Sequence, residues 1–430
     1  MWPVELGGTP PTLADGTTTV PYDPFHDLIW MDELTRMGAA GVLQGFGIQT
    51  MALPVVLRFA PPEVQRKVVP GVVRGEKFIS LCISEPTAGS DVADIRTTAQ
   101  LTADGRHYIV NGLKKWITWA VHADFFTVAV RTGEPGSGSK GISLLLLEKT
   151  MPGITLRRMK LQGNWAGGTC LVEFSDVKVP VGNLIGELNR GFKAIMINFN
   201  HERFQIAVQA SRSARMCLEE AVAYAKRRRT FGKRLVDHQV IRHKIAEMAS
   251  IVESLHAQLE QCAFQMKHAG GAPAEQQRLG AVLSLLKVQA SKGFEKCARE
   301  ASQIIGGSAY TRGGKGGVVE RLYREVRSVA IPGGSEEIML VSLRSPVVVP
   351  RKRKLTGISF LSLRHSFFFS FFFFFFFFFF TYFSSPPPSP TLPYPTLPYP
   401  TLPYRTLSSP SLPYPILPYP TPRASNRTWR

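Results

Sequence analysis

Three long helical periods in the second half of the chain constrain its fold most strongly. Apolar residues recur at intervals of three and four over residues 191–229, 237–270 and 274–307. Gly271 follows the second of these stretches and Gly306-Gly307 end the third, as glycines often end helices. Long helices with one apolar face bury that face against each other, so the pattern predicts a helical bundle over residues 188–343.

A block of short strand-like runs precedes these helices. Between residues 76 and 187, β-branched and aromatic runs alternate with Gly, Pro, Asp and Asn. The runs are KFISLCISE, HYIVNGLKKWITW, DFFTVAVRT, GISLLLLEK and GTCLVEFSDVKVP. Such a series predicts a compact β-domain, either a barrel or a sandwich. Residues 1–75 instead have helical spacing, including a helix opened by Pro61-Pro62, so the predicted fold class is α+β.

The last segment, residues 344–430, differs in character from the rest of the chain. It contains the unbroken run Phe371–Phe380 and repeats such as TLPYP, whose prolines exclude helix and central strand. We expect a disordered, low-complexity tail. The apolar stretch Phe367–Phe383 is marginal for a membrane span of about 20 residues, so a membrane anchor stays open. Translated simple-repeat DNA is the interpretation that we favour.

The net charge of +19 divides unevenly along the chain. The tail holds ten Lys and Arg and no Asp or Glu, which leaves 41 basic against 32 acidic residues in residues 1–343. That modest excess can serve anionic ligands generally, whereas a nucleic-acid surface would need more basic clusters with interleaved aromatics. The five cysteines include no CxxC or CxxxH spacing, so we expect reduced thiols and no metal site.

Glu202 lies within an apolar stripe of the first long helical period. Ile195 and Phe199 stand seven and three residues before it, and Ile206 stands four residues after it. A carboxylate in such a stripe is desolvated and its pKa rises. A carboxylate of this kind is a candidate general base.

Two other interpretations of Glu202 stay open from spacing alone. A helix kink near Asn198 or Asn200 would turn the side chain outward. A structural ion pair with Arg203 would give the carboxylate a purely stabilising role. Spacing by itself favours these structural interpretations slightly.

Four further stretches have the composition of ligand-binding loops. CISEPTAGSDVADIRTTA (82–99) ends a strand in small residues whose backbone N–H groups can approach a phosphate or a flat ring, although a plain hairpin loop is the simpler alternative. In KKWITWA, Trp116 and Thr118 are expected on one face of a strand, where they suit an aromatic cofactor, although core tryptophans are commoner.

KRRRTFGKRLVDHQ places Arg228 at a helix end, where it can hold a pyrophosphate or be merely solvated. AIPGGSEEIM (330–339) combines a tight turn with a helix start, a candidate anion or cofactor site.

Together these stretches resemble one family. SEPTAGSD, WIT, RRTFGKRLVDHQ, QIIGGSAY and GGSEEI follow in the order and at roughly the intervals of the acyl-CoA dehydrogenases, over about residues 1–343. The resemblance implies N-terminal helices, a middle β-domain and a C-terminal four-helix bundle, with FAD at their junction. It also implies a homodimer or homotetramer, and an electron-transfer flavoprotein as acceptor. The implied reaction oxidises a saturated acyl-CoA to the trans-2-enoyl-CoA, with hydride transfer to flavin N5, in fatty acid or branched-chain amino acid catabolism.

Carried over position by position, the resemblance assigns residues to the cofactor and to the substrate. The cofactor group is Leu81, Cys82, Ile83, Ser84, Ser90, Trp116, Ile117, Thr118, Arg228, Thr230, Phe231, Gln239, Gln303, Gly306, Gly307, Ser335 and Glu337. Within it, Gln303, Gly306 and Gly307 resemble the set that reaches a neighbouring subunit's FAD. The substrate group is Ser90, Asn200, Arg203, Gly333 and Gly334. No residue is assigned to a metal.

One departure from the family pattern concerns the base. Most members carry it as the Glu of a Glu-Gly-Thr turn, and the aligned residue here is Gly333. The isovaleryl-CoA and long-chain subclasses also lack that Glu and place the base on a helix, just before an Arg. That position here is Glu202, followed by Arg203, so the resemblance and the apolar stripe select the same residue. The N–H of Gly333 can still polarise the thioester carbonyl, because a backbone donor needs no side chain.

Some expectations concern the whole chain. WPVELGG resembles a segment that family members reach only after their first helices, and the last helix gives way to unrelated sequence after about Leu343, so we expect truncation at both ends. An acyl-CoA oxidase of the same fold and an inactive truncated remnant are the alternative functions. Nothing at the N-terminus reads as a signal or transit peptide. A mitochondrial location is favoured, with peroxisomal and cytoplasmic locations open.

Overall fold

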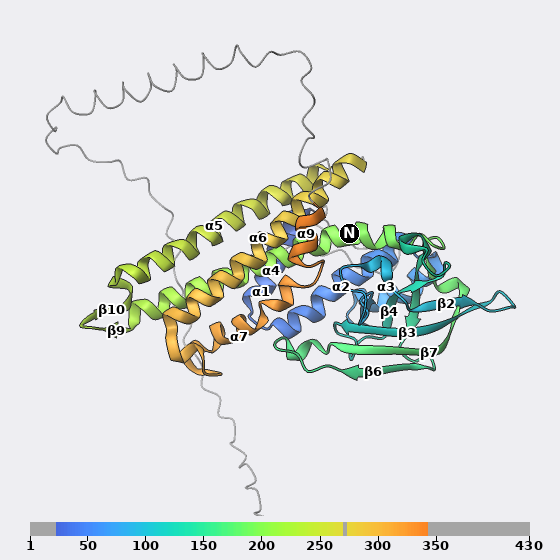
Figure 1. Ribbon diagram of the computed structural model, residues 1–430, viewed down its shortest axis with the longest axis horizontal. Coiled ribbons are helices and arrows are strands. Elements are labelled where there is room, and N and C mark those ends of the chain that lie inside the picture. Colours follow the sequence, from blue (N-terminus) through green and yellow to red (C-terminus); the bar gives the residue numbers. More distant parts are fainter. Residues whose placement is uncertain (1–22, 270–272, 343–430) are drawn as a thin grey trace, which may run out of the picture. The chain divides into compact units, whose positions relative to one another are not determined.

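Helices, then a sheet, then a helical bundle follow one another along the described chain (Figure 1). The computed structural model describes residues 23–269 and 273–342. The predicted tail over residues 344–430, with its Phe-rich run, and the first 22 residues lie outside the described residues. The order of the elements confirms the predicted α+β fold class.

The helices fall into an N-terminal group and a C-terminal group. The N-terminal group is α1 (Pro24–Arg36), α2 (Ala40–Phe59) and α3 (Pro62–Val73). The C-terminal group is α4 (Gly191–Arg227), α5 (Gln239–His268), α6 (Pro273–Ile305), α7 (Gly317–Glu325), α8 (Arg327–Ala330) and α9 (Glu336–Ser342). The three long helices α4, α5 and α6 confirm the three helical periods, and α9 packs on α6.

Local signals begin two of the N-terminal helices. The Oδ1 atom of Asp23 accepts a hydrogen bond from the N–H of Phe25 over 2.8 Å and so caps α1. Pro62 opens α3, as the sequence predicts, because a first-turn residue needs no hydrogen-bonded N–H. Among the described helices, α2 is long and apolar enough to cross a membrane by length and composition. Its buried face packs on α4 and on the sheet.

One eight-stranded sheet makes up the middle of the chain. Its strands are β1 (Ile79–Cys82), β2 (Thr98–Leu101), β3 (His107–Ile117), β4 (Phe125–Arg131), β5 (Ile142–Glu148), β6 (Ile154–Arg158), β7 (Cys170–Pro180) and β8 (Leu184–Ile185). They are ordered β6-β7-β3-β2-β4-β5-β8, with β1 parallel to β4. The five predicted runs are β1, β3, β4, β5 and β7. The prediction missed β2, β6 and β8, which are short.

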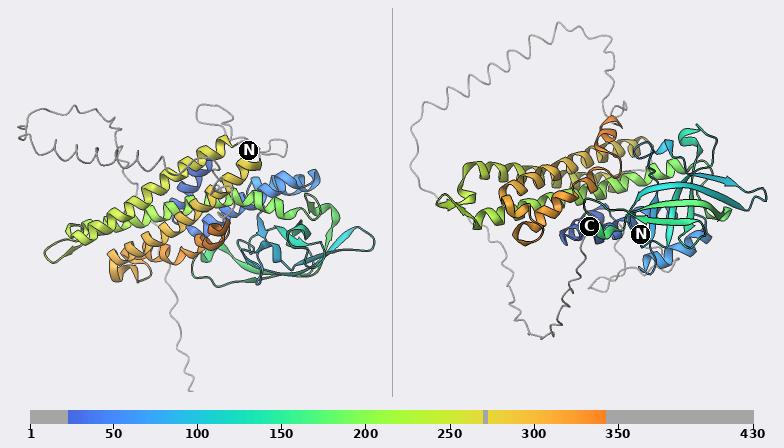
Figure 2. Two further views of the ribbon diagram at one scale, coloured as in Figure 1. Left: turned by 45° about the horizontal axis from the view of Figure 1, so that its top comes forward. Right: turned by 60° about the horizontal axis from the view of Figure 1, so that its bottom comes forward.

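Two hydrophobic cores meet along α4. Most of α4 contributes small residues such as Ala207, Ala210 and Ala214 to the bundle core, and these let α6 pack closely against it. Its first turns instead place Ile195 in a second core with Ile79 of β1 and residues of α2 and α3. Figure 2 shows α4 running from the sheet along the bundle. Residues near position 200 therefore lie where N-terminal helices, sheet and bundle meet.

Candidate active site

Glu202 is buried within α4 at this junction. The residue is only 8% exposed, and this burial raises the pKa of its carboxyl to about 7. Within the described part of the chain, Oε2 has no hydrogen-bond partner. The helix runs without a break from Gly191 to Arg227, and the burial of Glu202 shows that its side chain is not turned outward. The carboxyl is therefore a desolvated group with a proton-accepting oxygen to spare.

Arg203 does not pair with Glu202 but reaches a turn far along the chain. Its Nε donates to the carbonyl oxygen of Gly333 over 3.0 Å, and Nη1 donates to Oδ1 of Asn200 over 3.3 Å. Among the described residues no ion pair joins the Arg203 and Glu202 side chains, although the nearby Arg203 charge opposes part of the effect of burial on the pKa of Glu202. The turn is therefore fastened to α4 next to the candidate base.

The backbone of that turn requires glycine. Gly333 and Gly334 have φ angles of +70° and +102°, which residues with a Cβ rarely adopt. A Cβ on Gly333 would lie 3.1 Å from Cδ1 of Ile206, one helical turn beyond Glu202. The turn thus packs directly on the face of α4 that carries Glu202. As predicted, Glu336 starts the following helix.

Two further hydrogen bonds hold the turn between the bundle and the sheet. The buried Lys287 on α6 donates from Nζ to the carbonyl oxygens of Ala330 and Gly334, the latter over 2.9 Å. Burial lowers the pKa of Lys287 to about 8. The N–H of Ser335 donates to Oγ of Ser90 over 3.4 Å, which brings the predicted cofactor and substrate loops together.

The sheet contributes the ends of β1 and β3. The N–H of Lys115 donates to the carbonyl oxygen of Ser84, and Oγ of Ser80 donates to that of Thr118. Cys82 and Ile83 are buried, so they offer a ligand backbone groups rather than side chains. Trp116 is 47% exposed and remains available for stacking.

The expectation that Trp116 and Thr118 share a strand face is wrong. The pairing of β3 with β7 shifts register between Lys114 and Ile117, and Trp116 within the shift has a φ of +61°. Thr118 lies in the turn after the strand. A bulge cancels the two-residue alternation on which the expectation rested, so backbone geometry rather than strand period aims the indole.

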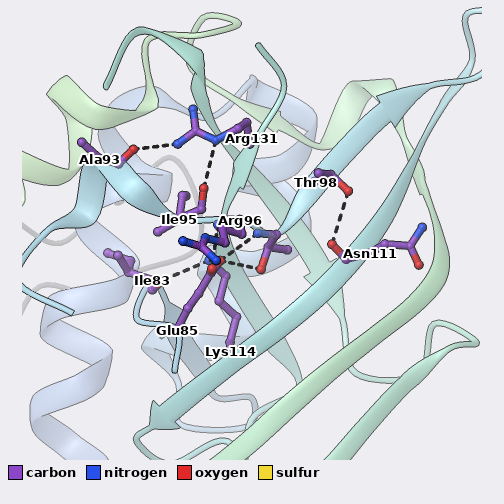
Figure 3. A network of polar contacts seen from close by, with 10 residues as sticks. Ile83, Glu85, Ala93, Ile95, Arg96, Thr98, Asn111, Lys114 and Arg131 are labelled. Carbon is purple, nitrogen blue, oxygen red and sulfur yellow. Dashed lines mark hydrogen bonds and ion pairs between the residues drawn. The ribbon is translucent and has the colours of Figure 1, made fainter. Parts of the chain in front are cut away.

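A buried ion pair supports the loop between Ser84 and Ser90. Glu85 accepts from Nζ of Lys114 over 2.8 Å, and both side chains are almost fully buried (Figure 3). The Glu85 carboxylate also accepts from the N–H groups of Arg96 and Thr97, at 2.6 and 2.9 Å. Burial opposes ionisation of Glu85, but the Lys114 charge and these donors hold its pKa below the usual range. Nζ of Lys114 also donates to the carbonyl oxygen of Ile83, so the pair ties the start of the loop to β3 and to residues 96 and 97.

Sequence reasoning missed the two supporting lysines. Lys114 and Lys287 both look like ordinary basic residues of a strand and a helix, and both are completely buried. A signal existed in each case. Lys114 aligns with inward positions in the alternation of β3, and Lys287 follows the apolar run LSLL of α6.

The other predicted cofactor residues lie at the opposite end of the bundle. Arg228 follows the end of α4, and the hairpin β9 (Arg229–Thr230) and β10 (Lys233–Arg234) leads into α5 (Figure 1). The residues found at this end are Arg228, Thr230, Phe231, Gln239, Gln303, Gly306 and Gly307, and all except the half-buried Thr230 are exposed. Arg228 lies 26 residues after Glu202, about 39 Å along a helix. The described chain thus divides the predicted cofactor residues into two separate groups.

No group of three or more His, Cys, Asp and Glu side chains could hold a metal ion between residues 23 and 269 or 273 and 342. The five cysteines are buried and free of disulfides there.

Comparisons with known proteins agree with the geometry. Residues 80–177 match the family description "Acyl-CoA dehydrogenase, middle domain", and residues 189–345 match "Acyl-CoA dehydrogenase, C-terminal domain". The chain is 41% identical over 338 residues to the acyl-CoA dehydrogenase apdG of Emericella nidulans, covering 77% of this chain and 76% of the relative. It is 31% identical to the caffeyl-CoA reductase-Etf complex subunit CarC of Acetobacterium woodii, covering 74% and 80%. A crystal structure of a probable acyl-CoA dehydrogenase from Mycobacterium abscessus superposes with a TM-score of 0.70 at 36% identity, covering 79% of this chain and 85% of that one.

Proposed function

Because this chain belongs to the acyl-CoA dehydrogenase family, whose members are FAD-dependent oxidoreductases, we propose that it converts a saturated acyl-CoA to the trans-2-enoyl-CoA with Glu202 as general base. The observation that carries the proposal is the buried carboxyl of Glu202, with a pKa raised to about 7 and an unpaired Oε2 within the described residues. A base with a pKa near the working pH is half ionised and still basic enough to accept a carbon-bound proton.

The residues around Glu202 suit the remaining steps. The C2–H bond of the acyl group breaks and its proton moves to Oε2 of Glu202, while the β-hydrogen leaves with its electron pair. FAD, when bound, supplies the acceptor for that hydride. The N–H of Gly333 is proposed to donate to the thioester oxygen, where negative charge develops. Arg203 and Lys287 hold that turn in place through its carbonyl oxygens.

The sheet side of the site fits a flat aromatic cofactor. Trp116 presents a half-exposed indole at the end of β3, beside the backbone of Ser84 and Thr118. Nζ of Lys115 lies 4.7 Å from the centre of the indole ring and makes a cation–π contact with it. We propose that Trp116 stacks on the isoalloxazine ring and that Ser84 and Ser90 contact the cofactor and the thioester.

A second copy of the chain would complete the cofactor site. The exposed group around Arg228 and Gln303 lies at the far end of the bundle, with Arg228 about 39 Å along α4 from Glu202. We propose a homodimer or homotetramer in which each FAD contacts the Trp116 side of one copy and the Arg228 or Gln303 side of another. The molar mass of the purified protein, measured by light scattering with and without FAD, tests this assignment. A monomer that retains stoichiometric FAD would overturn it.

The proposed acceptor is an electron-transfer flavoprotein. A relative that is 31% identical is named as a subunit of a reductase-Etf complex, which favours this acceptor over oxygen. The matching test reduces the flavin with acyl-CoA and then adds either air or an electron-transfer flavoprotein. Rapid reoxidation by oxygen alone would instead assign an acyl-CoA oxidase.

The function itself is tested by flavin absorbance. The purified full chain should carry FAD, and anaerobic addition of a straight-chain acyl-CoA should bleach the visible band and release an equal amount of enoyl-CoA. Absence of bleaching with hexanoyl-CoA and with longer and branched acyl-CoAs, in protein that carries FAD, would reject the function. Protein without FAD after reconstitution would support the inactive remnant.

A further inference from the structure

A buried amide lies one helical turn beyond the candidate base. Gln205 follows Glu202 by three residues on α4 and is 1% exposed. Positions three apart share a helix face, with Cβ atoms about 5–6 Å apart. Among the described residues, Nε2 of Gln205 has no hydrogen-bond partner, and neither has Oε2 of Glu202. An unpaired buried amide destabilises the folded chain, so its presence close to Glu202 needs a reason.

The seam between α2 and α4 holds this amide in place. The hydroxyl of Thr50 on α2 lies 2.9 Å from Oε1 of Gln205 and 2.8 Å from the carbonyl oxygen of Gly47. One turn before Glu202, Nδ2 of Asn198 donates to the carbonyl oxygen of Met51 over 2.7 Å. The face of α4 that carries Glu202 therefore makes polar contacts with α2 on both sides of that residue, and of the two residues that make these contacts, Asn198 and Gln205, Gln205 has a side-chain nitrogen without a partner in the described chain.

The single proton of the Thr50 hydroxyl decides which atom is left over. When Thr50 donates to Gln205, the amide NH₂ is the unpaired group. When Thr50 donates to Gly47, Gln205 must donate to Thr50, and its carbonyl oxygen is the unpaired atom. A hydroxyl group both donates and accepts, so it is complementary to Gln205 in either orientation.

We propose that Gln205 binds a hydroxyl group on the acyl chain, and that the physiological substrate class is hydroxylated acyl-CoA. The proposal rests on the proposed function, because it places the acyl chain along α4 from Glu202 toward Gln205. The hydroxyl lies a few carbons beyond the reacting carbons. A site that pairs with a substrate hydroxyl discriminates strongly against the analogue that lacks it, since the buried amide is then left unpaired.

Binding to a catalytically silent protein tests the proposal without turnover. The FAD-loaded full chain carrying Glu202→Gln is titrated calorimetrically with hexanoyl-CoA, 5-hydroxyhexanoyl-CoA and 6-hydroxyhexanoyl-CoA. We expect one hydroxylated ligand to bind about tenfold more tightly than hexanoyl-CoA. The additional substitution Gln205→Leu, similar in size, should bring that ratio to within about twofold of one. Thr50→Val, which removes the partner that orients the amide, should also reduce it.

Gln209→Leu is the matched control. Gln209 lies one turn further along α4 and lines a separate small pocket with Ser213 and Glu325. The control should keep the full preference for the hydroxylated ligand. Equal binding of all three ligands, or a preference that survives both Gln205→Leu and Thr50→Val, overturns the proposal, since the amide then meets only a buried water. Failure of the proposed function is seen separately, as absence of flavin bleaching in the protein with Glu202 intact.

Discussion

Nε of Arg203 donates a hydrogen bond to the carbonyl oxygen of Gly333 over 3.0 Å, although 130 residues separate the two in sequence. The bond joins the helix that carries Glu202 to the turn that carries the proposed thioester donor. Gly333, which aligns with the position of the catalytic carboxylate in most of the family, therefore lies next to the residue that we propose as the base. Under that proposal the carboxylate lies on α4 instead of on the turn, and the hydrogen bond keeps the two elements adjacent.

Replacement of Glu202 should remove the chemistry and keep the cofactor. Glu202→Gln preserves shape but cannot accept the α-proton, so we expect kcat to fall at least about 100-fold with FAD still bound. Glu219→Gln, an exposed carboxyl on the same helix, is the control and should keep full activity. Near-normal enoyl-CoA formation by Glu202→Gln would reject the assignment.

The activity should rise with pH through about 7. Only the ionised form of Glu202 accepts a proton, and burial raises the pKa of that carboxyl to about 7 in the free protein. The value of kcat/KM should therefore fall about tenfold per pH unit well below 7 and level off above it. A profile that is flat between pH 5.5 and 8 would show that another group is the base.

Ionisation of the buried Glu202 carboxyl should lower the free energy of unfolding at pH values above about 7. Its pKa is about 7 when folded against 4.5 in the unfolded reference, so the folded state binds the proton more tightly. Stability is then lost as the pH rises from about 4.5 to 7, by about 3 kcal/mol in all. We expect Glu202→Gln to raise the unfolding temperature at pH 8 relative to the natural protein, and the difference to shrink toward pH 5. An equal difference at both pH values would contradict the burial argument.

Removal of Lys114 should destabilise the sheet and loosen FAD. Lys114→Met leaves Glu85 buried without its counter-charge, which typically costs about 3–5 kcal/mol. Lys77→Met breaks the exposed pair with Asp124, which is worth less than about 1 kcal/mol, and serves as the control. Denaturant unfolding and FAD titration measure both effects. Similar unfolding midpoints for the two variants would show that the buried pair is dispensable.

A Cβ at position 333 should impair catalysis more than stability alone explains. Gly333→Ala strains a φ of +70° and places the methyl group 3.1 Å from Ile206. Gly105→Ala has a similar φ of +66° but open space around it, so both variants lose about 1–2 kcal/mol of stability from the backbone. Only Gly333→Ala should lower kcat, because it shifts the turn relative to Glu202. Equal kcat values in the two variants would show that the position of the turn does not affect the reaction.

The local pattern of apolar residues determined which segments of this chain form helices and strands. The periods of three and four residues predicted α4, α5 and α6, and the apolar runs predicted five of the eight strands of the main sheet, because both signals repeat along the chain itself. The same reasoning placed Glu202 in an apolar stripe, and the structure buries it. The separation of Arg228 from Glu202 follows from the same helical period, since 26 helical residues fix a length.

Tertiary contacts decided how those elements make a site. Arg203 with Gly333, Lys287 with Gly334, and Glu85 with Lys114 each join residues at least 29 positions apart, and no local pattern encodes such distances. A register shift, which arises only when β3 pairs with β7, aims Trp116. The sequence by itself determined that Glu202 is a buried helical carboxyl, because burial on a helix follows from spacing. Only the folded chain decided what surrounds that carboxyl, because hydrogen-bond partners are chosen by position in space.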